Sequence, residues 1–227
     1  KKKKKKNLII VAHPDDESFG MAGTIIKNSK KEDFYVVFLS DGERGRYKIG
    51  QYNRKIVTSR YAKAEKVKKL LGIKEFFFLN FIDQRLDSIS SLDITQKLEK
   101  IITKIKPSTI YTHFENDLNQ DHKICFNCAA VAIRPYRNPY IKKILTFEVP
   151  SSSGVYPGNS FNPNFYVRLS KTNFKKKIEA IKLYGKEVEE DDQPRSIKKI
   201  TALMSYRGSP INAEYAEAFH IIFQCED

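Results

Sequence analysis

Short apolar segments alternate with amphipathic segments along this chain, and the alternation restricts the fold more than any other feature. Five β-branched or aromatic runs predict strands at residues 7–13, 34–39, 75–81, 109–114 and 143–149. Apolar residues at helical spacing predict helices between them, at residues 20–28, 54–71, 92–105 and 122–133. The strands are too apolar to face water on either side. We therefore expect an α/β fold of three layers, a mostly parallel sheet with helices on both faces.

The rest of the chain predicts a C-terminal extension of the same domain. Residues 150–164 are rich in Ser, Gly, Pro and Asn and predict a loop, whose part from 155 onward could form a substrate wall. Helices are expected at about 174–190 and 195–206, and a strand or packing segment at 215–223. There is no internal repeat and no second core, so we expect one domain over residues 7–227.

Positive charge is concentrated at the beginning of the sequence. The formal net charge is +14, and Lys1 to Lys6 supply six of these charges. We expect residues 1–6 to be a disordered, solvated tail, the alternative being a handle for nucleic acid or an anionic membrane surface. No apolar run approaches the roughly 18 residues of a transmembrane helix. Three cysteines are too few for a disulfide framework. The apolar stretch at residues 7–12 is too short for a secretory signal, so a cytoplasmic location is the default expectation.

Histidines and acids gather where predicted strands end. His13 follows the first strand, and His122 follows an acidic turn after the fourth. Loops beyond the carboxyl ends of neighbouring parallel strands open on one crevice. Asp16 is three residues from His13 on a turn stiffened by Pro14, so both can hold one ion and His122 can complete the set. His-Asp-His is the kind of ligand set that a catalytic zinc uses, and other divalent ions would also be accepted.

Asp15 lies between two of these candidate ligands and would project differently from them. A carboxylate there can act as the base that takes a proton from water, once a metal has lowered the pKa of that water. The alternative is that the paired acids only cap the following helix and complement its dipole. The coincidence of two histidines with paired acids favours the metal site.

The segment AHPDDE, residues 12–17, resembles the signature of the LmbE-like or PIG-L superfamily of zinc-dependent N-deacetylases. Further matches to that family follow in order: SDGE at residues 40–43, Arg60, Asp83, the pair Asp121–His122, Arg207–Gly208 and YAEAF at residues 215–219. The resemblance extends over about residues 7 to 223.

This resemblance implies a Rossmann-like fold and the hydrolysis of the acetamide of an N-acetylated amino sugar, often an N-acetylglucosamine conjugate. By position it implies His13, Asp16 and His122 as zinc ligands and Asp15 as general base. It also implies that Arg60 and Asp83 contact the sugar.

Asn119 departs from the family pattern, because many members have a histidine there that stabilises the tetrahedral intermediate. We assign Asn119 to the catalytic set, since its amide can donate a hydrogen bond to an oxyanion, although it carries no charge. His113 or His220 could instead take the place of the missing histidine in space.

Three functions are therefore weighed. The first is an N-deacetylase whose partner is a small N-acetyl amino sugar conjugate, with peripheral membrane contact where the substrate is a glycolipid. The second is a non-enzymatic basic protein that binds nucleic acid or an anionic surface, but no recognisable nucleic-acid module supports it. The third is an enzyme with the same fold and metal that hydrolyses a different amide, for example that of another N-acyl sugar, a nucleotide-linked sugar or a glycolipid.

Overall fold

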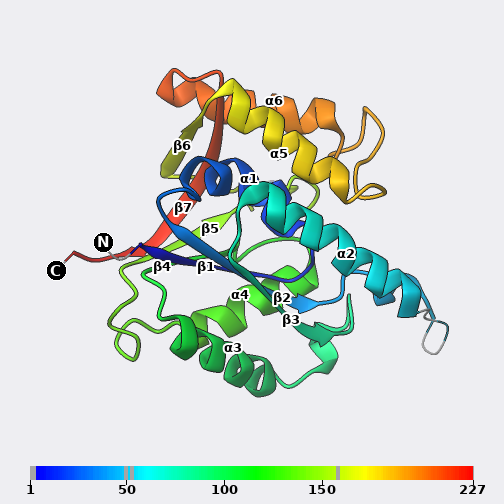
Figure 1. Ribbon diagram of the computed structural model, residues 1–227, viewed down its shortest axis with the longest axis vertical. Coiled ribbons are helices and arrows are strands. Elements are labelled where there is room, and N and C mark those ends of the chain that lie inside the picture. Colours follow the sequence, from blue (N-terminus) through cyan, green and yellow to red (C-terminus); the bar gives the residue numbers. More distant parts are fainter. Residues whose placement is uncertain (1–3, 49–50, 52–53, 157–158, 227) are drawn as a thin grey trace.

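The computed structural model describes residues 4–48, 51, 54–156 and 159–226. These residues form a seven-stranded sheet in the order β3-β2-β1-β4-β5-β7-β6 with helices on both faces, which confirms the predicted α/β fold (Figure 1). The strands are β1 (Lys6–Val11), β2 (Asp33–Ser40), β3 (Glu75–Phe81), β4 (Thr109–His113), β5 (Lys143–Phe147), β6 (Phe165–Leu169) and β7 (Tyr215–Gln224). The helices are α1 (Asp16–Asn28), α2 (Arg54–Leu71), α3 (Ser91–Ile105), α4 (Gln120–Ala132), α5 (Lys171–Leu183) and α6 (Ile197–Gly208), with short 3-10 turns η1 (Arg44–Arg46), η2 (Leu86–Ser88) and η3 (Ser209–Ile211).

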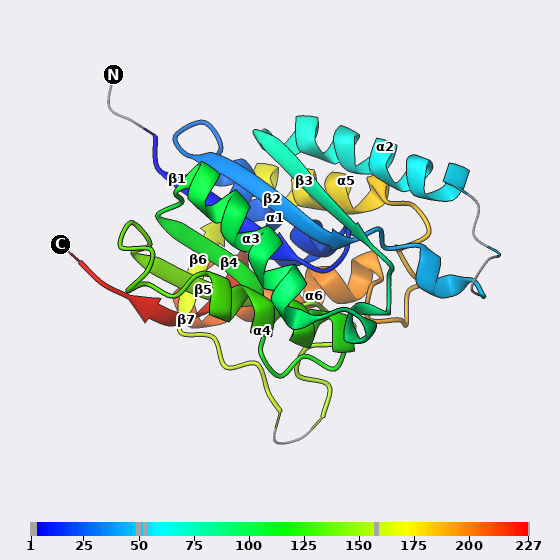
Figure 2. The ribbon, with the colours of Figure 1, turned by 90° about the horizontal axis from the view of Figure 1, so that it is seen from below.

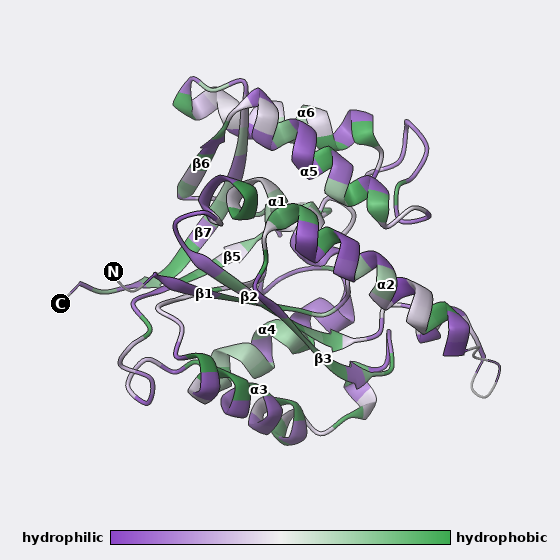
Figure 3. Ribbon diagram, in the orientation of Figure 1, coloured by the Kyte–Doolittle hydropathy of each residue, from purple (hydrophilic) through white to green (hydrophobic). Residues whose placement is uncertain are grey.

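The first five strands are parallel, and β1, β2, β4 and β5 are buried on both faces, whereas β3 at the edge of the sheet is partly exposed. One apolar cluster packs the sheet against α1, α2, α5 and α6, and a second packs the other face against α3 and α4 (Figures 1 and 2). Hydrophobic and hydrophilic residues alternate along α2, α3 and α5, whose apolar sides face the sheet (Figure 3). This two-sided burial is why the strands read as continuous apolar runs.

Two elements of the C-terminal part differ from the sequence prediction: an unexpected strand, and a helix that ends early. Residues 165–169, which the sequence left unassigned, form β6, and the expected C-terminal segment is the strand β7. β7 runs antiparallel between β5 and β6, so the sheet is mixed at this edge. The predicted helix at 174–190 ends earlier, at Leu183, and Gly185 follows it at a φ of 67°.

The N-terminal lysines are partly ordered. Lys6 is the first residue of β1, and its Nζ donates to the carbonyl of Ile105 at 2.8 Å. The Nζ of Lys4 lies 4.0 Å from Asp33, and Lys1 to Lys3 lie outside the described residues. The first strand therefore begins one residue inside the segment expected to be a tail. Within the described part of the chain, no helix is long and apolar enough to cross a membrane.

Helix α1 begins at a candidate metal ligand, Asp16, and lies very close to the sheet. A Cβ atom on Gly20 would lie 2.2 Å from a ring carbon of Phe147 on β5, so only glycine allows this approach. We expect Gly20→Ala to lower the free energy of unfolding by about 1–3 kcal/mol through overpacking, measured by urea denaturation. Ser205→Ala, at an exposed position of α6, is the control, and equal stability of the two variants would contradict this packing.

Helix α1 is interrupted at Met21, and a residue near the end of the sequence caps the part of the helix that follows. Met21 has non-helical angles (φ −149°, ψ 19°), which frees the backbone N–H groups that follow it. Those of Gly23 and Thr24 donate to the Glu217 carboxylate on β7 at 2.9 and 2.6 Å. Lys177 of α5 donates to the same carboxylate at 2.7 Å, and both side chains are 2% exposed. Glu217 thus caps the second part of α1, and the buried Lys177 is its counter-ion.

Removing Lys177 should be costly because it leaves the Glu217 charge buried without a cation. We expect Lys177→Met to destabilise the fold by about 3–5 kcal/mol. Lys171 on the same helix forms an exposed pair with Glu214 at 3.3 Å, and Lys171→Met should cost less than about 1 kcal/mol. Thermal and urea unfolding of the two variants provide the comparison, and a Lys177→Met loss as small as that of Lys171→Met would show that the buried pair is unimportant.

Candidate metal and catalytic site

The candidate residues meet where the order of the sheet reverses. β1 lies between β2 and β4, and the loops after β1 and β4 leave the sheet side by side. This is the position at which open α/β sheets bind ligands. His13, Asp15 and Asp16 follow β1, and Asn119 and His122 lie at the start of α4.

His13, Asp16 and His122 are brought together as the sequence predicted. Asp16 Oδ2 lies 3.3 Å from His13 Nδ1, Asp16 Oδ1 lies 3.4 Å from His122 Nε2, and the two histidine nitrogens are 3.3 Å apart. One donor atom from each residue fits within 4.8 Å, and all three side chains are buried. Asp16 Oδ1 is also buried and accepts no hydrogen bond from the described residues. A buried carboxylate with one unsatisfied oxygen, lying against two imidazoles, fits a bound cation.

Carboxylates hold the outer nitrogens of both histidines. His122 Nδ1 lies 3.1 Å from Asp117, and His13 Nε2 lies 3.0 Å from Asp83 and 3.2 Å from Asp121. The Asp121 carboxylate in turn accepts from the backbone N–H groups of residues 84 and 86. Carboxylate partners on the second ring nitrogen are typical of metal-bound histidines, because they fix the ring and its tautomer.

The charges of this cluster are strongly coupled. Burial disfavours an imidazolium, yet the hydrogen bonds that its ring N–H groups donate to Asp121 and Asp16 raise the pKa of His13 well above its ordinary value. Burial likewise opposes ionisation of Asp16, but the charge of His122 holds the pKa of its carboxyl well below the usual range. The cluster without a cation therefore favours protons on the imidazoles, which a metal would displace on binding.

The loop that carries these ligands is tightly constrained. Asp15 has a φ of 146°, a conformation that costs a non-glycine residue about 1–3 kcal/mol. The surroundings hold it in place, because Glu17 accepts from the Asp15 N–H at 3.0 Å and Asp16 Oδ2 accepts from the His13 N–H at 2.8 Å. The strained peptide turns Asp15 away from its neighbour Asp16, so the adjacent acids have different surroundings.

Asp15 faces arginines instead of histidines. Its Oδ2 lies 2.9 Å from Nη2 of Arg60 and 3.2 Å from Nη1 of Arg195. Burial raises the pKa of the Asp15 carboxyl, and the two guanidinium charges oppose that rise. Arg60 is only 1% exposed, and its Nη1 donates to Glu187 at 2.7 Å. Glu43 lies 3.9 Å from the same Nη1, so the charge of Arg60 is engaged with three carboxylates.

Asn119 is the N-cap of α4. Its Oδ1 accepts from the backbone N–H groups of Asp121 and His122 at 2.9 and 3.4 Å. This leaves its amide N–H groups as the donors available to the site, beside which it lies.

Neither alternative histidine takes the place of Asn119. His113 lies under the site: its ring stacks on His122 at 3.9 Å, its Nε2 accepts from the Ala12 N–H, and it is fully buried. Burial and the charge of His122 lower the pKa of His113 to about 4. His220 is on β7, with Nδ1 2.8 Å from the carbonyl of Asn162.

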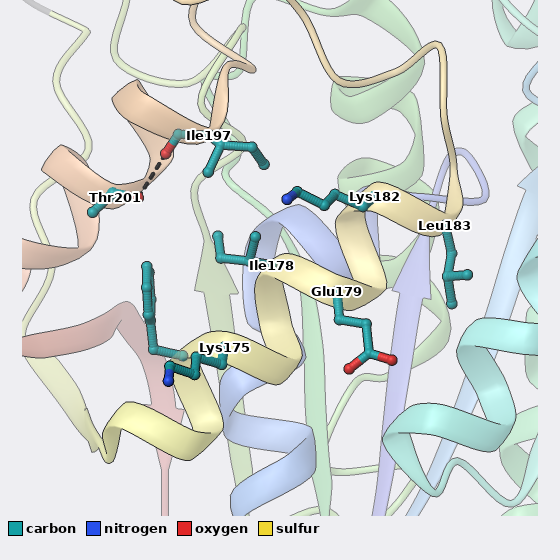
Figure 4. A pocket seen from close by; sticks show the side chains of 8 residues that line it. Lys175, Ile178, Glu179, Lys182, Leu183, Ile197 and Thr201 are labelled. Atoms are coloured by element: carbon teal, nitrogen blue, oxygen red, sulfur yellow. Dashed lines mark hydrogen bonds between the residues drawn. The ribbon is translucent and has the colours of Figure 1, made fainter.

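A cavity of about 160 Å³ opens beside the ligand cluster. Its lining includes His13, Asp15, Arg60, Asp83, Gln84, Asn119, Glu187 and Arg195. A larger hollow of about 590 Å³ lies between α5 and α6 (Figure 4). Its walls are mainly apolar and aliphatic, with Glu179 the one carboxylate among the lining residues described there, so it offers no comparable ligand set.

Sequence reasoning missed several contributors to the site. Glu187 and Arg195 lie between α5 and α6, in a charged segment without a recognisable motif. Ser151 and Ser153 connect the loop after β5 to the site, through Arg195 and Asp117 respectively. Of the expected wall, Phe161 packs against Phe114, residue 156 is exposed, and residues 157–158 lie outside the described part.

Comparison with known proteins identifies the family. Residues 8–133, more than half of the chain, match the model of the PIG-L family, described as GlcNAc-PI de-N-acetylase. The chain belongs to this family of N-deacetylases, as the signature at residues 12–17 indicated.

A curated relative is named a deacetylase, and solved structures share the fold. The uncharacterised deacetylase YaiS of Escherichia coli K12 is 28% identical over 79% of this chain and 90% of its own. The solved N,N'-diacetylchitobiose deacetylase of Pyrococcus horikoshii superposes with a TM-score of 0.79 at 24% identity, over 96% of this chain and 84% of that one. GalB, a 4-carboxy-2-hydroxymuconate hydratase of Pseudomonas putida KT2440, superposes with a TM-score of 0.78 at 21% identity, over 98% of both chains. The fold alone therefore does not determine the reaction.

Proposed function

We propose that this protein is a metal-dependent hydrolase that removes the acetyl group from an N-acetylglucosamine-type conjugate. The observation that carries the proposal is the buried His13–Asp16–His122 cluster with Asp15 beside it at the edge of a cavity. The sugar class is inferred from relatives, which include a probable N-acetyl-α-D-glucosaminyl L-malate deacetylase 2 of Bacillus subtilis, 33% identical over 52% of this chain and 56% of its own.

We assign His13, Asp16 and His122 as ligands of a divalent ion, with zinc as the expected metal. An ion held there would supply a Lewis acid for the amide carbonyl and lower the pKa of water. The imidazole and carboxylate donors fit zinc, and they would also accept other divalent ions.

The side chains around this cluster have distinct roles in the proposed reaction. Asp15 takes the proton of the attacking water and returns a proton to the leaving amine, so that water and amide become acetate and a free amino sugar. The Asn119 amide donates to the developing oxyanion. Arg60 is committed to Asp15 and Glu187, and Asp83 to His13, so we assign both to holding these groups in addition to bordering the sugar.

The experiment is an acetate-release assay on free, nucleotide-linked, lipid-linked and thiol-conjugated N-acetyl sugars. We expect release from at least one substrate, loss of release after chelation and recovery with zinc. Absence of release from all four classes would contradict the proposal. The nucleic-acid-binding alternative predicts a salt-dependent shift of random DNA instead, and the family match does not favour it.

A further inference from the structure

The Asp15 carboxylate is one corner of a closed ring of charges. Arg60 and Arg195 both approach its Oδ2, at 2.9 and 3.2 Å. Glu187 closes the ring on the opposite side, since it lies 2.7 Å from Arg60 and 3.5 Å from Arg195. Two carboxylates and two guanidinium groups thus balance one another, and a third arginine, Arg46, donates to Glu187 at 2.9 Å. All four side chains of the ring are largely or completely buried.

Arg195 is the member of the ring that comes from the C-terminal part of the chain and borders the cavity. Its Nε donates to Ser151 Oγ at 2.8 Å, and its guanidinium lies over the Phe19 ring at 4.8 Å. Its backbone N–H donates to Glu189, and the next residue, Ser196, is the N-cap of α6. Contacts therefore restrain the backbone N–H, the Nε and the guanidinium group of Arg195. The side chain is 16% exposed and is among those that line the cavity.

These contacts restrict how the Asp15 carboxylate can turn. Both guanidinium contacts fall on Oδ2, and they come from two different elements, α2 and the segment before α6. A carboxylate held at one oxygen by two charged donors keeps a fixed orientation and presents its other oxygen. Proton abstraction needs such precision, because a displacement of about 1 Å can cost about 10²-fold in rate.

We propose that Arg195, oriented by Glu187 and Ser151, is a positioning residue that fixes the Asp15 carboxylate for proton transfer. This inference rests on the proposed function, in which Asp15 is the base. It assigns a role to residues 187 and 195, which lie outside the part of the chain that matches the family model.

The test compares Arg195→Met and Arg195→Lys with Lys198→Met, which removes an exposed charge from the adjacent helix. We expect kcat of Arg195→Met to fall by about 10²-fold, with KM within about threefold of the wild type because ground-state binding is retained. Metal content should stay at the wild-type level. Guanidinium chloride at millimolar concentration should restore part of kcat in Arg195→Met and none in Lys198→Met, an effect that a purely structural role would not produce.

The other possible outcomes would assign Arg195 a different role. A kcat of Arg195→Met within about threefold of the wild type would overturn the proposal. A rise in KM without a fall in kcat would make Arg195 a substrate contact instead. If the wild type releases no acetate, the proposed function fails, and crystal structures of the wild type and Arg195→Met still decide the inference. We expect the Asp15 carboxylate to rotate in the variant, and an unchanged orientation would contradict the positioning role.

Discussion

Replacing Asp15 by asparagine is expected to lower kcat by about 10²–10⁴-fold, the usual contribution of a general base. The substitution keeps the size and shape of the side chain at this strained backbone position. It removes the group that accepts the proton but none of the three proposed ligands. We therefore expect the metal content to remain at the wild-type level.

The measurement pairs steady-state acetate release with elemental analysis of the same sample. Asp87→Asn, at an exposed position of η2, is the matched control and should retain wild-type activity. Because Asp15 is also a counter-ion of Arg60, thermal unfolding should be followed in parallel to show that the variant is folded. An Asp15→Asn variant with most of its activity would remove Asp15 from the role of base.

Replacing His122 by asparagine is expected to abolish zinc binding and, with it, acetate release. The side chain supplies one of three ligands from a fully buried position, and asparagine cannot place an imidazole nitrogen there. Only His13 and Asp16 would remain, fewer than the three protein ligands of a catalytic zinc site. The effect should appear without any substrate, in zinc content after dialysis.

Stability provides a second readout of the same ligand. A metal that binds only the folded state stabilises it by about 2.7 kcal/mol at a hundred times its Kd, so zinc should raise the unfolding temperature of the wild type and not of His122→Asn. His220→Asn is the matched control, because His220 is on β7 and bonds to Asn162. Wild-type zinc content in His122→Asn would refute the ligand assignment.

Much of the central fold could be predicted because it is encoded locally. The range 54–71 is the helix α2 and the range 75–81 is the strand β3, as expected from apolar spacing and a following glycine. The cluster of His13, Asp16 and His122 was also predictable, since ends of neighbouring parallel strands meet by topology. These inferences needed no knowledge of distant contacts.

The remaining elements depend on contacts between distant segments. β6 is a short edge strand after an irregular loop, and its partner β7 lies some fifty residues later. Glu187 and Arg195 read as solvated charges in the sequence, and only the packing of α5 and α6 onto α1 and the sheet brings them to Asp15. Nor could spacing alone show that His113 is buried under His122 instead of replacing the family histidine at Asn119.

The break in α1 and its cap from Glu217 determine which shortened or recombined forms of this chain can keep the site. The family model matches residues 8–133, so a chain shortened to that part would still match it, without the motif at residues 215–219. It would lack the carboxylate that caps α1, the helix whose first residue is Asp16, and it would lack Arg195 beside Asp15. We therefore do not expect the part that matches the family model to work as a transplantable module. Recombination or truncation between β4 and β7 would separate residues that act together.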